Sequence, residues 1–176
     1  MSGTPGAGKS TMAKLLGQPL GAVVIDHDII KSTVLADGNI SFDQAAKSAY
    51  SLCWALAESM MKQGFSVIVD NGLRLAELFG FEYWYIECRV DDLDLMDERL
   101  QKRVPLRSQR MGVDHPPVDA SSCRQGEESR ALFRRWIEKP CRPREDDKAS
   151  VAVVDSTGNP EGRPDYALEQ MALQAR

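Results

Sequence analysis

The chain has 176 residues, 43% of them hydrophobic, which suffices for one compact domain over residues 1–176 but leaves little room for a second. Its formal net charge of -4 argues against a protein that holds nucleic acid or an acidic membrane through bulk positive charge, so any polyanion contact must be local. It has neither a signal-peptide pattern nor a run of about 18 apolar residues, and we therefore expect a soluble, cytoplasmic protein.

The first predicted element is a glycine-rich loop with the spacing of a phosphate-binding P-loop, Gly3-Thr4-Pro5-Gly6-Ala7-Gly8-Lys9-Ser10. Glycines at these positions let successive backbone N–H groups turn inward and surround phosphate oxygens. Lys9 would reach the β- and γ-phosphates, and the hydroxyl of Ser10 would be a ligand of Mg²⁺. A short helix predicted from Ser10 to Gly17 would point its positive end at the same anion. The loop therefore predicts a nucleoside triphosphate site with magnesium.

A short apolar run at 22–25 predicts a buried parallel strand, and two acids follow it. Ligands of open α/β sheets bind at the carboxyl ends of strands, so an acid there could accept a proton from an attacking hydroxyl. We favour Asp28 over Asp26 for this role, because Lys31 lies one turn beyond it and could hold a phosphate or an acidic substrate. The alternative is that Asp28 caps a helix and Lys31 is solvated.

The clearest helix follows Ser41, which forms a predicted capping box with Gln44, and it extends to Gly64. A second buried strand at 66–70 ends in Asp70. An acid at this place is typical of a Walker-B residue that holds Mg²⁺ directly or through water. The alternative for Asp70 is a structural acid at the end of a strand.

The remaining elements continue the alternation of strands and helices. We expect strands at about 81–88 and 151–155, and helices at about 92–103, 127–137 and 160–174, with an irregular segment at 103–117. This alternation predicts an α/β protein in which a parallel sheet is covered by helices on both faces.

The densest basic stretch of the chain lies around the irregular segment and consists of Arg99, Lys102, Arg103, Arg107 and Arg110. Arginines on a mobile segment beyond a strand can close over a triphosphate and stabilise the charge that develops during transfer. The alternative is a solvated helix end.

These features together resemble the kinase-like P-loop proteins labelled AAA-domain ATP-binding proteins, which are relatives of zeta toxins, gluconate kinases and polynucleotide 5′-kinases. The resemblance rests on six blocks in order along the chain: SGTPGAGKST, VVIDHDIIK, GFSVIVDN, FGFEYWYIECRVDDLDLMDERLQKR, RVPLRSQR and VAVVDSTGNP. It implies a three-layer fold with five strands in the order 2-3-1-4-5, a lid at about 103–117, and transfer of the ATP γ-phosphate to a hydroxyl.

The resemblance also implies roles for individual residues. Phosphate and metal would be bound by Gly6, Gly8, Lys9, Ser10 and Thr11, the acceptor would face Asp28, the lid would carry Arg103, Arg107 and Arg110, and the nucleobase would lie near Ser156, Thr157 and Gly158.

The sequence departs from the family pattern in three places. Only Met1 and Ser2 precede Gly3, where the family has a buried strand, so we expect the first, central strand to be missing from this chain. Lys31 stands where relatives usually have arginine, and lysine cannot bind phosphate in the bidentate manner. The connection after Asp70 is short for a crossover between parallel strands.

The sequence thus favours a phosphotransferase that uses ATP and Mg²⁺ and acts on a small-molecule hydroxyl. Three alternatives stay open: a module that binds or hydrolyses NTP without an acceptor, a kinase of nucleic-acid 5′-hydroxyls, which is less favoured, and an inactive truncated relative. The identity of the acceptor, the preference between ATP and GTP, and the oligomeric state do not follow from the sequence.

Overall fold

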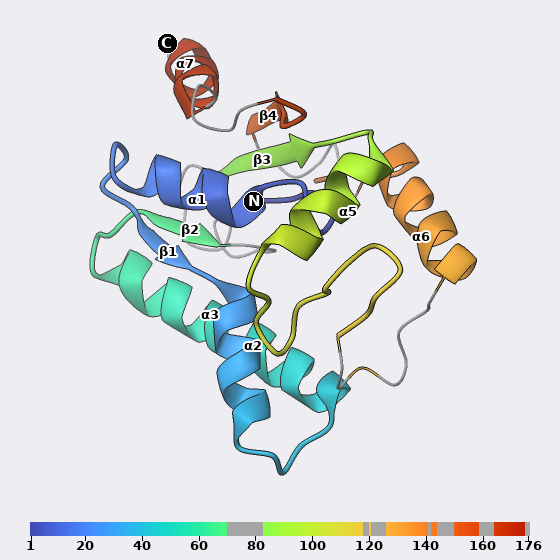
Figure 1. Cartoon of the computed structure of the whole chain (residues 1–176). Coiled ribbons are helices and arrows are strands. Elements are labelled where there is room, and N and C mark those ends of the chain that lie inside the picture. Colours follow the sequence, from blue (N-terminus) through green and yellow to red (C-terminus); the bar gives the residue numbers. More distant parts are fainter. Residues whose placement is uncertain are drawn as a thin grey trace.

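The computed structural model describes residues 1–69, 83–117, 120, 126–140, 142–143, 150–158 and 164–174 (Figure 1). It has parallel strands with helices packed on both faces, as the alternating pattern predicts. Among these described residues, no helix is both long and apolar enough to span a lipid bilayer.

The strands form two parallel pairs. One pair is β1 (Val23–Ile25) with β2 (Val67–Val69), and the other is β3 (Trp84–Arg89) with β4 (Ser150–Asp155). β1, β2 and β4 lie within one residue of the predicted strands, whereas β3 begins three residues after its predicted start at about 81. Within the described part of the chain, this differs from the continuous five-stranded ladder that the family resemblance implies.

Met1 and Ser2 lie between the two pairs. The Met1 nitrogen donates a hydrogen bond of 2.8 Å to the carbonyl oxygen of Val69 in β2. Ser2 forms a parallel bridge with β3, in which its N–H donates to Ile86 and its carbonyl accepts from Cys88, both at 2.8 Å. The residues before the loop therefore occupy the central position expected of the first strand. The expectation that a full first strand is missing stays a prediction.

The helices begin and end where local signals place them. Their bounds are α1 (Lys9–Gly17), α2 (His27–Ala36), α3 (Phe42–Lys62), α5 (Leu93–Lys102), α6 (Gly126–Glu138) and α7 (Pro164–Gln174). The predicted capping box of Ser41 and Gln44 is confirmed at the start of α3. Asp92 caps α5 by accepting hydrogen bonds from two backbone N–H groups. The expected start of the last helix at about residue 160 lies outside the described residues.

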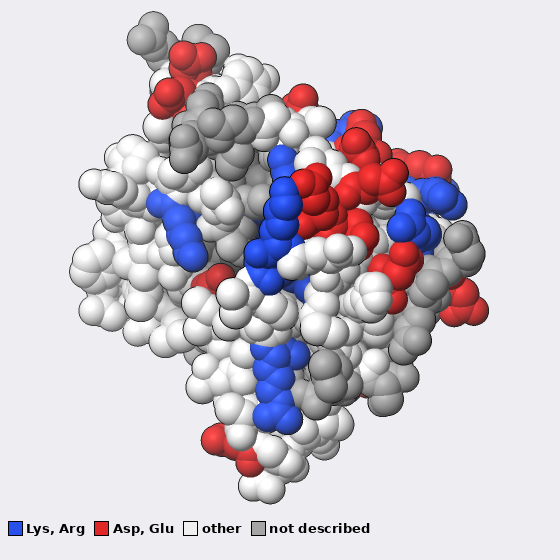
Figure 2. All heavy atoms as spheres, viewed as in Figure 1, with Lys and Arg blue, Asp and Glu red and all other residues white. Residues whose placement is uncertain are grey.

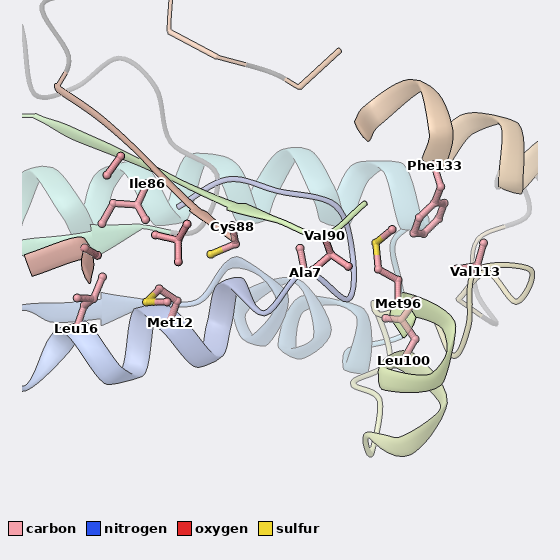
Figure 3. Packing of buried hydrophobic residues seen from close by; sticks show 13 residues of the cluster. Ala7, Met12, Leu16, Ile86, Cys88, Val90, Met96, Leu100, Val113 and Phe133 are labelled. Carbon is pink, nitrogen blue, oxygen red and sulfur yellow. The ribbon is translucent and has the colours of Figure 1, made fainter. Parts of the chain in front are cut away.

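Two clusters of apolar side chains hold the layers together. The larger lies between the β3–β4 pair and helices α1 and α7, and it continues to α5 and α6, where Met96, Leu100 and Phe133 are buried (Figure 3). The smaller packs Cys53 and Ala57 of α3 against the other strand pair. Ala7 of the glycine-rich loop is completely buried in the larger cluster together with Cys88 and Val90, so the loop packs near the carboxyl end of β3.

Candidate functional site

The glycine-rich loop has the open backbone that phosphate binding requires. Gly3, Gly6 and Gly8 all have positive φ, at 136°, 87° and 87°. Gly8 is the N-cap of α1 and supplies no side-chain hydrogen bond, so the N–H groups of the first helical turn have no side-chain cap. A Cβ atom added at Gly8 would meet nothing within 4 Å, which leaves room for an anion at this helix terminus.

The underside of the loop is fixed to the core. Ala7 is packed against the buried cluster that includes Val90 and Met96 (Figure 3). The hydroxyl of Thr4 donates to the sulfur of Met96 at 3.0 Å. The Lys9 ammonium group lies over the loop and donates to the Thr4 carbonyl at 3.3 Å. The side chain of the predicted phosphate-binding lysine is therefore held against the predicted cradle.

The two acids after β1 have different tasks. Asp26 is the N-cap of α2, and its carboxylate accepts hydrogen bonds from the N–H groups of Asp28 at 2.9 Å and Ile29 at 3.3 Å. The alternative in which Asp28 caps the helix is thus wrong. Because the cap is supplied by Asp26, the carboxylate of Asp28 is available for other contacts.

Asp28 lies among positively charged and donor groups from three elements. Its Oδ2 accepts a hydrogen bond of 2.8 Å from Nε2 of Gln109, and its Oδ1 lies 3.8 Å from Nδ1 of His27. Burial alone would raise the pKa of Asp28, but the neighbouring His27 ring, the hydrogen bond from Gln109 and the positive charge of Lys9 outweigh it and lower that pKa below its usual range. Asp28 is therefore a carboxylate near the lysine of the loop, able to accept a proton at neutral pH.

The segment 103–117 crosses next to α2 and brings Arg103 toward the same acid. Burial lowers the pKa of Arg103, and the negative charge of Asp28 opposes this shift. Its Nη2 donates to the carbonyl of Arg110 at 2.8 Å, while its Nε is buried without a hydrogen-bond partner among the described residues. Lys9, Asp28 and Arg103 thus converge from three parts of the chain.

Charge on this face is organised locally. Figure 2 shows a row of basic side chains running down the molecule, next to acidic side chains that gather over α5. The exposed acids of this region include Asp91, Asp92, Asp94 and Glu98. Although the whole chain has a negative net charge, basic side chains gather locally on this face, as a local polyanion contact requires.

The other two predicted lid arginines lie in different surroundings. Arg107 is exposed. Arg110 is buried, and its Nη1 donates to the carbonyl of Val113 and to the hydroxyl of Ser129 in α6, both at 2.9 Å. Its guanidinium also lies 5.3 Å from the centroid of the Phe133 ring. Arg110 therefore joins the segment 103–117 to α6, and its predicted catalytic role stays a prediction.

This difference gives a test of stability. Replacing Arg110 with alanine is expected to lower the free energy of unfolding by about 2 kcal/mol, because two buried acceptor groups lose a charged donor. The exposed Arg107→Ala variant should change it by less than about 0.5 kcal/mol. Urea unfolding measures both. An Arg110→Ala variant that keeps its stability but loses nucleotide affinity would instead assign the Arg110 guanidinium to the ligand.

The predicted residues near the nucleobase lie at the end of β4. Ser156 is buried, and its N–H donates to the carbonyl of Arg89 at 2.7 Å. The carbonyls of Thr157 and Gly158 each accept a hydrogen bond of 3.3 Å from the guanidinium of Arg99. Arg99 thus holds the residues that follow β4 against α5.

Three other expectations have different outcomes. Lys31 is buried toward α3, with its Nζ 3.3 Å from the centroid of the Phe42 ring, so it is neither solvated nor directed at the loop in this structure. Asp70, the predicted magnesium ligand, lies outside the described residues. Ser10 and Thr11 begin α1 directly after the loop, as expected.

Sequence reasoning missed the polar residues that fix the segment to α2. Gln109 contacts Asp28, and Ser108 bonds with Ser32. In the sequence, Ser108 and Gln109 are marked only by their position between Arg107 and Arg110 in an irregular segment. Their spacing in the sequence does not predict a contact with α2.

Comparisons with known proteins agree with this geometry. A family model described as an AAA domain matches residues 1–120. A search of curated proteins finds no match. A solved structure from Chloroflexus aurantiacus, described as a candidate kinase, is similar with 19% identity and a TM-score of 0.68, over 99% of this chain and 92% of that one.

A sugar kinase from Janibacter sp. HTCC2649, solved without ligand, is also similar, with 15% identity and a TM-score of 0.58 over 97% of this chain and 91% of that one. At sequence identities this low, the similarity to these two structures establishes the fold alone. The chain therefore has the P-loop fold of these kinase structures.

Proposed function

Because the chain belongs to the AAA domain family, we propose that it binds ATP with Mg²⁺ and transfers the γ-phosphate to a hydroxyl group of a small molecule. The observation that supports this most directly is the convergence of Lys9, Asp28 and Arg103 beside the uncapped N-terminus of α1. A cradle for phosphate next to an ionised carboxylate is the arrangement that hydroxyl phosphorylation needs.

Each residue group has a distinct task in this proposal. The backbone of the loop, from Gly3 to Gly8, and the first turn of α1 bind the phosphates, and Lys9 neutralises their charge. Ser10 and Asp70 hold Mg²⁺, which supplies further neutralisation of the phosphate oxygens when bound.

As the oxygen of the acceptor hydroxyl forms a bond to the γ-phosphorus, Asp28 accepts the proton of that hydroxyl. The bond from that phosphorus to the β–γ bridging oxygen breaks, and ADP leaves with the electron pair. The segment 103–117 acts as a lid, on which Arg103 and Arg107 stabilise the transferring group. The residues Ser156 to Gly158 lie beside the nucleobase.

The test uses the purified chain, γ-labelled ATP, Mg²⁺ and a panel of small hydroxyl compounds, with a 5′-hydroxyl oligonucleotide as a separate arm. Asp28→Asn should lower transfer by about 10²-fold or more, since it removes the general base. Asparagine keeps an oxygen for Gln109, so the Mg-ATP-induced rise in Tm should persist.

Asp37→Asn is the matched control, because Asp37 is an exposed acid at the C-terminus of the same helix. It should leave transfer unchanged. Transfer that survives Asp28→Asn would contradict the assigned base. Release of phosphate without any labelled acceptor would favour an NTP-hydrolysing module, and labelling of the oligonucleotide alone would favour a nucleic-acid kinase.

A further inference from the structure

We propose that Gln109 is a positioning residue, which holds one oxygen of Asp28 and thereby directs the other toward the hydroxyl that loses its proton. This inference deepens the proposed function and rests on Asp28 being its base. The geometry that carries it is a set of hydrogen bonds between the segment 103–117 and α2.

The Gln109 side chain is fixed at both ends of its amide. Its Nε2 donates to Oδ2 of Asp28 at 2.8 Å, and its Oε1 accepts from the N–H of Leu106 at 3.1 Å. Its own N–H donates back to the carbonyl of Leu106 at 2.8 Å, which closes a turn. Because the amide oxygen already serves Leu106, the amide NH₂ has to face the carboxylate, and the direction of the hydrogen bond is defined.

The turn that carries Gln109 is itself fixed to α2. The N–H of Ser108 donates to the hydroxyl of Ser32 at 3.1 Å, and this hydroxyl donates to Oγ of Ser108 at 2.9 Å. Oγ of Ser108 then donates to the backbone carbonyl of Asp28 at 3.2 Å. In this series of hydrogen bonds, each N–H or O–H group donates to an oxygen that can accept. Two adjacent residues therefore hold both the backbone and the side chain of Asp28.

The two oxygens of Asp28 are left in different states. Oδ2 is occupied by Gln109, whereas the ring nitrogen of His27 lies 3.8 Å from Oδ1, beyond hydrogen-bonding distance. The Asp28 side chain keeps 35% of its surface exposed, so a ligand can still approach it. With one oxygen anchored, Oδ1 is the atom that receives the proton.

The titratable groups that face Asp28 are Lys9 from the loop, His27 from α2 and Arg103 from the segment. Gln109 does not titrate, and its hydrogen bond favours the ionised carboxylate of Asp28. Burial opposes ionisation, and the donors overcome it, so loss of the Gln109 donor should raise the pKa of Asp28.

The test is Gln109→Met, which keeps the length of the side chain and removes its donor. We expect kcat for phosphate transfer to fall about tenfold, the equivalent of one hydrogen bond to a charged group, with an unchanged KM for ATP. Activity that needs ionised Asp28 is lost as the pH falls through its pKa. The acid limb of the pH profile should therefore move to higher pH in the variant.

Gln101→Met is the matched control, because Gln101 makes the same kind of amide–carboxylate bond, at 2.6 Å to Asp97, on the exposed face of α5. It should leave kcat and the acid limb unchanged. If Gln109→Met does not fold, Gln109→Glu keeps the oxygen for Leu106 and places a negative charge against Asp28, and it should raise the pKa of Asp28 further.

An NMR titration of the Asp28 carboxyl carbon in the ligand-free protein tests the contact with Gln109 independently of phosphate transfer. A higher pKa in Gln109→Met together with the moved acid limb supports the inference. An unchanged pKa of Asp28 in both Gln109 variants overturns it, even when the wild type transfers phosphate. If the wild type transfers phosphate to no acceptor, the proposed function fails, and the positioning role of Gln109 fails with it. The titration still reports the hydrogen bond between Gln109 and Asp28 in that case.

Discussion

Replacing Lys9 with alanine is expected to abolish the rise in Tm that Mg-ATP causes and to lower phosphate transfer about 10³-fold. Lys9 is the positive side chain over the loop, held 3.3 Å from the Thr4 carbonyl, and its charge would neutralise the oxygens of the β- and γ-phosphates. Charge stabilisation of this kind acts in a partly water-excluded site, where it has its largest effect. Thermal melting with and without Mg-ATP measures binding, and label transfer measures the rate.

Lys14→Ala is the control for this experiment. Lys14 lies on the same helix, is exposed, and belongs to the last turn of α1 rather than the first. It should bind Mg-ATP as the wild type does. A Lys9→Ala variant with wild-type affinity and transfer would show that the glycine-rich loop is not the nucleotide site.

Gly3→Ala is expected to destabilise the whole fold by about 3 kcal/mol or more, a sum of backbone strain and steric overlap. A Cβ atom at this position would lie 2.3 Å from the backbone oxygen of Cys88 in β3, and the φ angle of 136° excludes most side chains. The atom in the way is backbone, so it cannot rotate aside. Urea unfolding of the variant measures the loss, and an unfolded product would be its extreme form.

Gly64→Ala separates strain from overlap. Gly64 has a φ of 86°, but a Cβ atom there would meet nothing within 4 Å. Its cost should be about 1 kcal/mol, the penalty for an L-residue in the left-handed region alone. Equal losses at the two positions would mean that the contact with Cys88 has no influence on stability.

Features with local signals were predicted well. The loop, the capping box of Ser41 and the positions of the strands depend on spacing and residue type within a few positions, and the structure confirms them. The expected burial of the strand at 66–70 is wrong for Val67–Val69, which are only half-buried. The family resemblance is confirmed too, because a model of the AAA domain matches residues 1–120.

Features that depend on tertiary contacts were not predictable. Asp26 and Asp28 are both acids after a strand, and the backbone angles at Asp26 decide which one caps α2. Arg103 and Arg110 look alike in the sequence, yet the first faces Asp28 and the second is buried against α6. A helix after the first predicted strand appeared only in the alternative in which Asp28 caps it, and the structure places the cap two residues earlier, at Asp26.

The place of Ser2 has a mechanical consequence. Within the described residues, the two strand pairs share no ladder, and Met1 and Ser2 hydrogen-bond to one strand of each. The next residue along the chain is the first glycine of the loop. A displacement of the loop would therefore reach both strand pairs through the hydrogen bonds of Met1 and Ser2, in addition to the contacts that α1 makes with β1, β2 and β3.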